Sequence, residues 1–126
     1  MAVVVDTSIL IDHLRGVDAA RKLLSDAGRA RRGVAASVLT KTELIVGAHR
    51  DDERRIQQLF AQVYWVPVVE TLADQAGSLV ARFKKSHRGI ELVDYVIAAT
   101  AIALDAPLLT RNVKHFPMFE GLQSPY

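Results

Sequence analysis

The sequence contains no cysteine, and this absence removes several kinds of chemistry at once. A disulfide framework, a thiolate metal site and a cysteine nucleophile are all excluded. A long apolar run is missing as well, because the longest one, Val96 to Leu104, is about half of a membrane span. Asp6 follows only three valines, which is too early for the apolar region of a signal peptide. We therefore expect a soluble, cytoplasmic protein that does not enter a membrane.

A large excess of charge is also lacking. The 16 basic and 14 acidic residues give a formal net charge of +2, which permits a nucleic-acid partner without requiring one. Each local group of basic residues is compatible with a solvated helix end or loop. The three groups are Arg29 with Arg31 and Arg32, then Arg82, Lys84, Lys85, His87 and Arg88, and finally Arg111, Lys114 and His115.

Short apolar runs alternate with helical patterns along the 126 residues, with no repeat or linker between them. Strands are expected at 2–5, 33–36, 64–69 and 107–110, and helices at 9–14, 17–27, 37–48, 51–63, 71–86 and 93–104. The last helix is apolar almost all round and is expected to be central and buried. Alternating strands and helices imply parallel pairing with helices on both faces. The fold class is therefore α/β, as one three-layer α/β/α domain over residues 1–126.

Four polar residues are expected where a parallel sheet binds ligands, beyond the carboxyl ends of its strands. Asp6 directly follows the first strand, and Asn112 lies two residues after the last one. Asp94 opens the most apolar helix of the chain, on the same face as two alanines. The helical spacing of Glu43 places it on an inward stripe with Leu39 and Val46.

Each of these residues also has a purely structural explanation. Asp6 would cap the following helix, and Asp94 would answer the dipole of its own helix. Glu43 would turn to solvent if its helix were rotated, and Asn112 is an ordinary loop residue. Local capping nevertheless gives no reason for three acids from distant segments to meet at one edge of a sheet.

Three clustered carboxylates repel one another unless a cation neutralises them. Oxygen ligands without cysteine or paired histidines favour a hard ion, Mg²⁺ or Mn²⁺, over zinc. Such a site suits the in-line attack of water on a phosphodiester, with the metal activating the water.

Four segments together resemble PIN domains, and most of all the VapC-type toxins of toxin–antitoxin systems. These segments are Val3 to Ser8, Leu39 to Leu44, Leu92 to Ala101 and Leu109 to Phe116. The resemblance runs from about residue 3 to residue 122. It implies a mostly parallel sheet of about five strands, metal-dependent endoribonuclease activity with Mg²⁺, a homodimer, and inhibition by a cognate VapB-type antitoxin whose tail covers the active site.

Carried over by position, the resemblance assigns catalytic roles to Asp6, Glu43, Asp94 and Asn112. The three acids would bind the metal, while Thr7, Ser8 and Thr110 match hydroxyl positions that support the site. His115 falls where some relatives have a further acid, which puts a tightly held second metal in doubt. The residues expected to contact RNA beside the last strand are Arg111, Lys114 and His115.

Apolar residues in the two helices after the first strand indicate a protein partner, independently of the family resemblance. Ile9, Leu10, Leu14, Val17, Leu23 and Leu24 are numerous for elements at the margin of a small domain. We expect part of them to form an exposed groove beside Asp6 that fits an amphipathic helix.

Two rival functions follow from the same residues. A phosphatase that forms an aspartyl-phosphate would also place an acid after its first strand, but it would carry a second acid where this chain has Ser8. A non-catalytic PIN-like module would bind RNA or protein without cutting.

Overall fold

The valine- and alanine-rich runs of the sequence form the strands of a single sheet. The computed structural model describes residues 2–30 and 33–126. The strands are β1 (Val3–Val5), β2 (Val34–Ser37), β3 (Val63–Val66) and β4 (Leu108–Leu109). Their order is β3-β2-β1-β4, and every neighbouring pair is parallel.

The sheet in this part of the chain has four strands, whereas about five were expected. After β4 the described chain enters a short 3-10 helix, Val113–His115, and an irregular tail. No fifth strand therefore forms among residues 2–30 and 33–126. β3 is an edge strand that ends before Pro67, so the strand expected to reach residue 69 is shorter than predicted, because proline has no N–H to donate.

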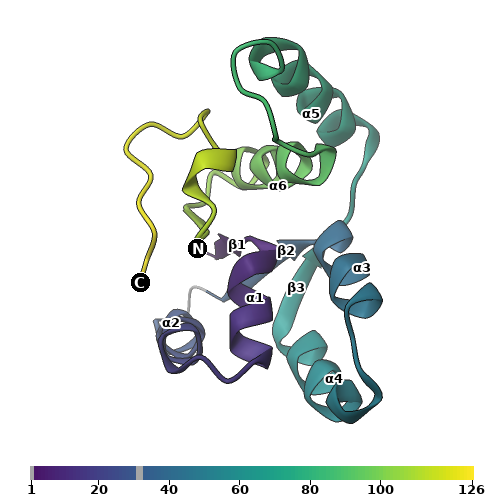
Figure 1. Ribbon diagram of the computed structural model, residues 1–126, viewed down its shortest axis with the longest axis vertical. Helices are drawn as coiled ribbons and strands as arrows, with labels where there is room; N and C mark the ends of the chain where they lie inside the picture. Colours follow the sequence, from purple (N-terminus) through teal and green to yellow (C-terminus); the bar gives the residue numbers. More distant parts are fainter. Residues whose placement is uncertain (1, 31–32) are drawn as a thin grey trace.

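Helices cover both faces of the sheet, as Figure 1 shows. One face is covered by α1 (Thr7–Leu14), α2 (Asp18–Arg29) and α4 (Glu53–Gln62), together with Leu44 of α3 (Val38–Val46). The other face is covered by α5 (Glu70–Phe83) and α6 (Leu92–Ala103). A further 3-10 helix, Arg50–Asp52, precedes α4. The predicted three-layer α/β/α architecture is confirmed.

The three valines of β1 connect the two halves of the hydrophobic core. Val3 and Val5 pack in the cluster formed with α1, α2 and α4, whereas Val4 packs in the cluster formed with α5 and α6. This alternation follows from the pleat of a strand, in which successive side chains point to opposite faces. Because all three are buried, the position of Asp6 directly after β1 is tightly fixed.

The helix boundaries mostly follow the local signals. Gly16 adopts φ +83° after α1, a conformation that suits glycine, and the Ser37 hydroxyl accepts a hydrogen bond from the N–H of Leu39 at the start of α3. The second helix was expected to end at residue 27, but α2 continues to Arg29. Of the first basic group, Arg31 and Arg32 lie outside the described residues.

The most apolar helix, α6, is central and buried as predicted. Every residue from Tyr95 to Ala101 is buried, and the Thr100 hydroxyl donates to the carbonyl of Val96 at 2.8 Å. α5 packs along it at the far side of the sheet (Figure 1). Within the described ranges, none of the helices combines the length and the apolar character needed to cross a bilayer.

Candidate active site

Asp6 is held at the carboxyl end of β1 by three hydrogen bonds. Its Oδ1 accepts the N–H of Thr7 at 2.8 Å, and its Oδ2 accepts the hydroxyls of Ser8 at 2.9 Å and Thr110 at 2.7 Å. The side chain is the N-cap of α1, so the structural explanation for this acid is realised. Only 3% of Asp6 is exposed, however, and a buried carboxylate held by a residue 104 positions away does more than cap a helix. The bonds fix the orientation of its oxygens.

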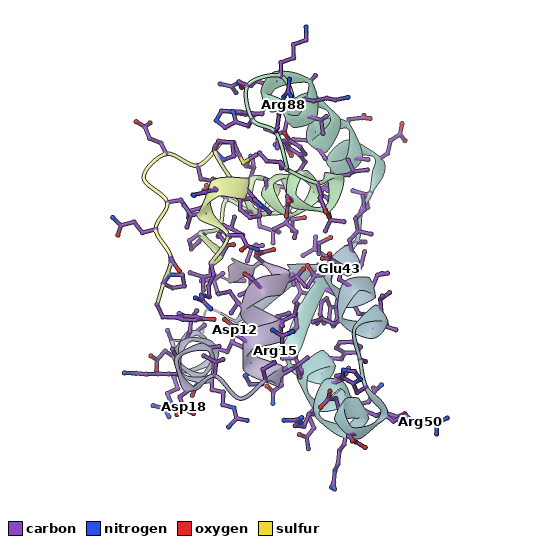
Figure 2. All side chains as sticks on the ribbon, in the orientation of Figure 1. Asp12, Arg15, Asp18, Glu43, Arg50 and Arg88 are labelled. Carbon is purple, nitrogen blue, oxygen red and sulfur yellow. The ribbon has the colours of Figure 1, made fainter. Side chains whose placement is uncertain are left out.

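Glu43 reaches the same neighbourhood from α3. Its Oε1 accepts the hydroxyl of Thr7 at 2.6 Å, and the hydroxyl oxygen of Thr7 lies 3.0 Å from that of Thr40. The two threonines are buried, whereas Glu43 is largely exposed. Figure 2 labels Glu43 on α3. Thr7 thus connects the two carboxylates, because its N–H donates to Asp6 and its hydroxyl donates to Glu43.

The inward stripe predicted for α3 is wrong. Val46 is 81% exposed, and the buried positions of this helix are Thr40 and Leu44. α3 is rotated so that Thr40 meets Thr7 of α1, which places Glu43 at the boundary between the buried face and solvent. Glu43 therefore reaches Thr7 from the rim of the site, and not from an apolar stripe.

Asp94 lies in the first turn of α6 with 14% of its side chain exposed. Its Oδ2 accepts the N–H of Glu91 at 3.0 Å and lies 3.2 Å from Nδ1 of His115. Burial raises the pKa of Asp94, the Glu91 hydrogen bond and His115 oppose this rise, and the charge of Asp6 adds to it. The charge of Asp6 thus acts on Asp94, which also forms a capping box with Glu91 at the start of its own helix.

Asn112 follows Thr110 out of β4 into solvent. Its N–H donates to the Thr110 hydroxyl at 2.9 Å, so Thr110 connects the backbone of Asn112 to the carboxylate of Asp6. Asn112 and Ser8 both line a shallow pocket of about 400 Å³. The hydroxyl positions Thr7, Ser8 and Thr110 all contact an acid of the site directly.

The residues expected to contact RNA have different surroundings. Nη1 of Arg111 lies 3.1 Å from Oδ2 of Asp12, and its guanidinium lies 5.3 Å from the ring centre of Tyr126. The Tyr126 hydroxyl donates to the same Asp12 oxygen at 2.7 Å, so Tyr126 contacts both Asp12 and Arg111. Asp12 is labelled on α1 in Figure 2. His115 contacts Asp94, and Lys114 is exposed.

Among residues 2–30 and 33–126, no three acidic or histidine side chains stand close enough to enclose a metal ion. Thr7 lies between Asp6 and Glu43, because it donates its N–H to the first and its hydroxyl to the second. Asp94 instead accepts the N–H of Glu91 and lies beside His115. The chemistry of this donor set, carboxylate and hydroxyl oxygens with a like-charge repulsion at Asp94, fits a hard divalent cation.

Sequence reasoning missed Thr40, Asp12 and Tyr126. Thr40 carried a weak signal, since it lies three residues before Glu43 and so on the same side of α3. Asp12 and Tyr126 are 114 residues apart, and no local pattern predicts that they meet.

Comparison with known proteins identifies the family. The family model described as PIN domain matches residues 3–117. A protein of Mycobacterium tuberculosis named Ribonuclease VapC19 is 48% identical over 122 residues, covering 97% of this chain and 98% of the relative.

Solved structures show the same fold. A toxin–antitoxin complex from Klebsiella pneumoniae contains a chain with a TM-score of 0.82 and 29% identity, covering 99% of this chain and 98% of that one. A chain of VapBC-1 from nontypeable Haemophilus influenzae gives a TM-score of 0.75 and 28% identity, covering 98% of this chain and 96% of that one. The chain therefore belongs to the PIN-domain family, in which near-full-length relatives are named as VapC ribonucleases.

Proposed function

We propose that this protein is a metal-dependent endoribonuclease that acts in the cytoplasm as the toxin of a toxin–antitoxin pair. The observation that carries the proposal is the anchoring of the Asp6 carboxylate at the carboxyl end of β1 by Ser8 and Thr110, with Glu43 joined to the same turn through the Thr7 hydroxyl. Near-full-length similarity to a protein named Ribonuclease VapC19 supports the choice of RNA as substrate.

Asp6, Glu43 and Asp94 are the residues that we propose to hold Mg²⁺, or Mn²⁺ in its place. A cation would relieve the repulsion between Asp6 and Asp94. Glu43 would join them by turning its exposed side chain away from the Thr7 hydroxyl that it accepts in this structure. Asn112 is the fourth residue of the proposed site, tied to it through Thr110.

The surrounding hydroxyls have a definite part in this mechanism. Ser8 and Thr110 both donate to Oδ2 of Asp6, which fixes that carboxylate before any substrate binds. Bound Mg²⁺ would supply an activated water for in-line attack on the phosphodiester and stabilise the charge that develops there. The chain itself orients the carboxylates and positions the RNA backbone at the edge of the sheet.

Arg111, Lys114 and His115 are proposed to meet the phosphates of the RNA. Lys114 is exposed, whereas Arg111 lies against Asp12 and His115 against Asp94. A phosphate must therefore compete with Asp12 for Arg111. This competition makes Lys114 the stronger contributor to binding of the two.

We also propose that a VapB-type antitoxin encoded beside this protein covers the site. Ile9 and Leu10 of the expected apolar groove are fully buried and belong to the core. Leu14 remains partly exposed and lines, together with Glu43, a pocket of about 180 Å³. A basic residue of the partner could reach Glu43 through this pocket. Co-expression with the neighbouring open reading frame tests the idea, and failure of the two proteins to copurify would contradict it.

A homodimer is part of the proposal, since it is what the family resemblance implies. Ile45, Val46 and Tyr64 are large apolar side chains that are more than half exposed, and a second copy would cover such a surface. Analytical ultracentrifugation of the purified protein measures the state directly. A monomer at micromolar concentration would remove this element of the proposal.

The decisive experiment is cleavage of a structured RNA with Mg²⁺, with Mn²⁺ and with a chelator. The Asp94→Asn variant should lower the cleavage rate by about a hundredfold or more, because it removes charge that the metal needs. Asp74→Asn is the matched control, since this acid is exposed on α5, away from the site.

Cleavage at an unchanged rate in chelator, or by the Asp94→Asn variant, would contradict the mechanism. Binding of RNA without cleavage under any metal condition would favour the alternative, a non-catalytic PIN-like module that binds RNA or protein.

A further inference from the structure

A larger cavity, of about 740 Å³, opens between α5, α6 and the segment 84–91 that joins them. Its volume lies in the range of about 300–1,000 Å³ that is usual for pockets that bind small molecules. Figure 1 shows this pair of helices stacked at one end of the molecule, and Figure 2 labels Arg88 there. None of the residues assigned to the active site lines it.

The rim of the cavity is basic. Lys84, Lys85, His87 and Arg88 contribute to its lining, and no acidic residue does so among the described residues. No ion pair with an acid of the described chain neutralises these four side chains. The His87 ring is held in place, with Nδ1 2.8 Å from the Ser86 hydroxyl oxygen and its centre 5.7 Å from that of the Phe83 ring, at an interplanar angle of 64°. The rim therefore offers an organised positive charge to an anion.

The floor of the same cavity is apolar and aromatic. Val80, Ile90, Leu92 and Tyr95 line it, and Leu92 is 65% exposed although it is a large apolar side chain. Only 3% of Tyr95 is exposed, and its buried hydroxyl has no hydrogen-bond partner within the described ranges. Buried polar groups are nearly always paired, so this hydroxyl marks an interaction that the isolated chain leaves unmade. An inorganic anion would use the rim and leave the floor uncovered.

The cavity shares the first turn of α6 with the proposed catalytic edge. Leu92 and Tyr95 line the cavity, while Asp94 lies between them in the sequence. One turn of helix rises only about 5.4 Å. The cavity therefore lies within about one helical turn of Asp94 along the axis of α6, within reach of an RNA strand that extends past Asp94.

We propose that this cavity is a nucleotide subsite, in which one unpaired nucleotide of the RNA inserts its base next to the cleaved phosphodiester. The base would cover the exposed side chain of Leu92, and Lys84, Lys85 and Arg88 would hold its phosphate. Recognition of single-stranded RNA commonly combines a positive groove with an aromatic or apolar platform for an unstacked base. The inference deepens the proposed ribonuclease function and rests on it for the identity of the ligand.

Binding is measured separately from cleavage, in the Asp6→Asn background, so that RNA remains intact. The probes are a single-stranded oligoribonucleotide, adenosine monophosphate, inorganic phosphate and a polyglutamate peptide. Leu92→Ala should weaken oligoribonucleotide binding about tenfold, because it removes the apolar side chain that the base would cover. Lys84→Gln with Lys85→Gln should weaken it and also reduce its salt dependence.

Two control variants separate these effects from general damage. Leu104→Ala removes a partly exposed leucine at the opposite end of α6, and Lys22→Gln with Arg29→Gln removes two exposed charges from α2. Both controls should bind RNA as the parent protein does. Circular dichroism and thermal unfolding confirm that each variant is folded.

The outcomes are distinct. Unchanged binding by the Leu92→Ala variant, or equal affinity for inorganic phosphate and adenosine monophosphate, overturns the subsite. Preference for polyglutamate over RNA overturns it in favour of a protein-docking surface. If the wild-type chain cleaves RNA in the metal assay and the Leu92→Ala variant binds RNA as the parent does, the subsite alone is refuted. If the wild-type chain does not cleave RNA and the Leu92→Ala variant binds RNA more weakly, the proposed nuclease is refuted instead.

Discussion

The hydrogen bond from Thr110 to Asp6 allows a quantitative test of how the site is held together. Thr110 is fully buried, donates to Oδ2 of Asp6 at 2.7 Å and accepts the N–H of Asn112 at 2.9 Å. Thr110→Val keeps the shape of the side chain and removes both bonds. A hydrogen bond to a charged group contributes about 1.5–3 kcal/mol, and the additional methyl group offsets up to about 0.8 kcal/mol of this loss. We expect the free energy of unfolding to fall by about 2 kcal/mol.

The assay is urea unfolding in a buffer with chelator, so that metal binding does not contribute to stability. With a slope of about 1–3 kcal/mol per molar urea, the midpoint should fall by roughly 1 M. Thr100→Val is the matched control, because Thr100 is equally buried but its hydroxyl bonds only to the carbonyl of Val96 within α6. That loss should cost less than about 1 kcal/mol, since a local bond to a neutral carbonyl is weaker. Equal midpoints for the two variants would refute the reasoning.

Two further predictions concern the group around Asp12. Burial and the hydrogen bond to Asp12 raise the pKa of Tyr126 to about 12, so this stabilisation is complete below the unfolded pKa of about 10 and is lost as pH rises towards 12. The absorbance difference between the wild type and Tyr126→Phe should show that the Tyr126 phenolate forms near pH 12, and Asp12→Asn should lower this pKa. A transition of Tyr126 near pH 10 in the wild type would contradict the contact with Asp12. In RNA binding, Lys114→Gln should flatten the salt dependence by about 0.7 in the logarithmic slope, and Arg111→Gln by less, because Asp12 already neutralises it. Equal slopes for both variants would argue against the Arg111–Asp12 pair in solution.

The order of elements and the position of Asp6 could be read from the sequence. The valine run gave β1, and the all-round apolar pattern gave α6 as the buried helix. The helix expected to begin at residue 9 begins at Thr7, because Asp6 itself is the N-cap. Asp6 needed only its place directly after a strand, because the carboxyl ends of parallel strands necessarily share one edge. These are local properties, so a single sequence contains them.

The helical spacing of apolar residues gave a wrong prediction at α3, because it placed Val46 and Glu43 on the buried face of the helix. A helix of nine residues has only two buried positions, Thr40 and Leu44, and which side they lie on depends on the helix that it meets. The meeting of Thr40 with Thr7 sets that rotation. No spacing within α3 contains this information.

What only the tertiary structure decided are the contacts between distant segments. Thr110 reaches Asp6 across 104 residues, Tyr126 reaches Asp12 across 114, and the basic segment 84–91 becomes the rim of a cavity only because α5 packs against α6. Sequence patterns record which face of an element is apolar, since burial is required for each element separately. They do not record which polar side chains then face each other, because that depends on how rigid elements pack, and packing is a property of the whole chain.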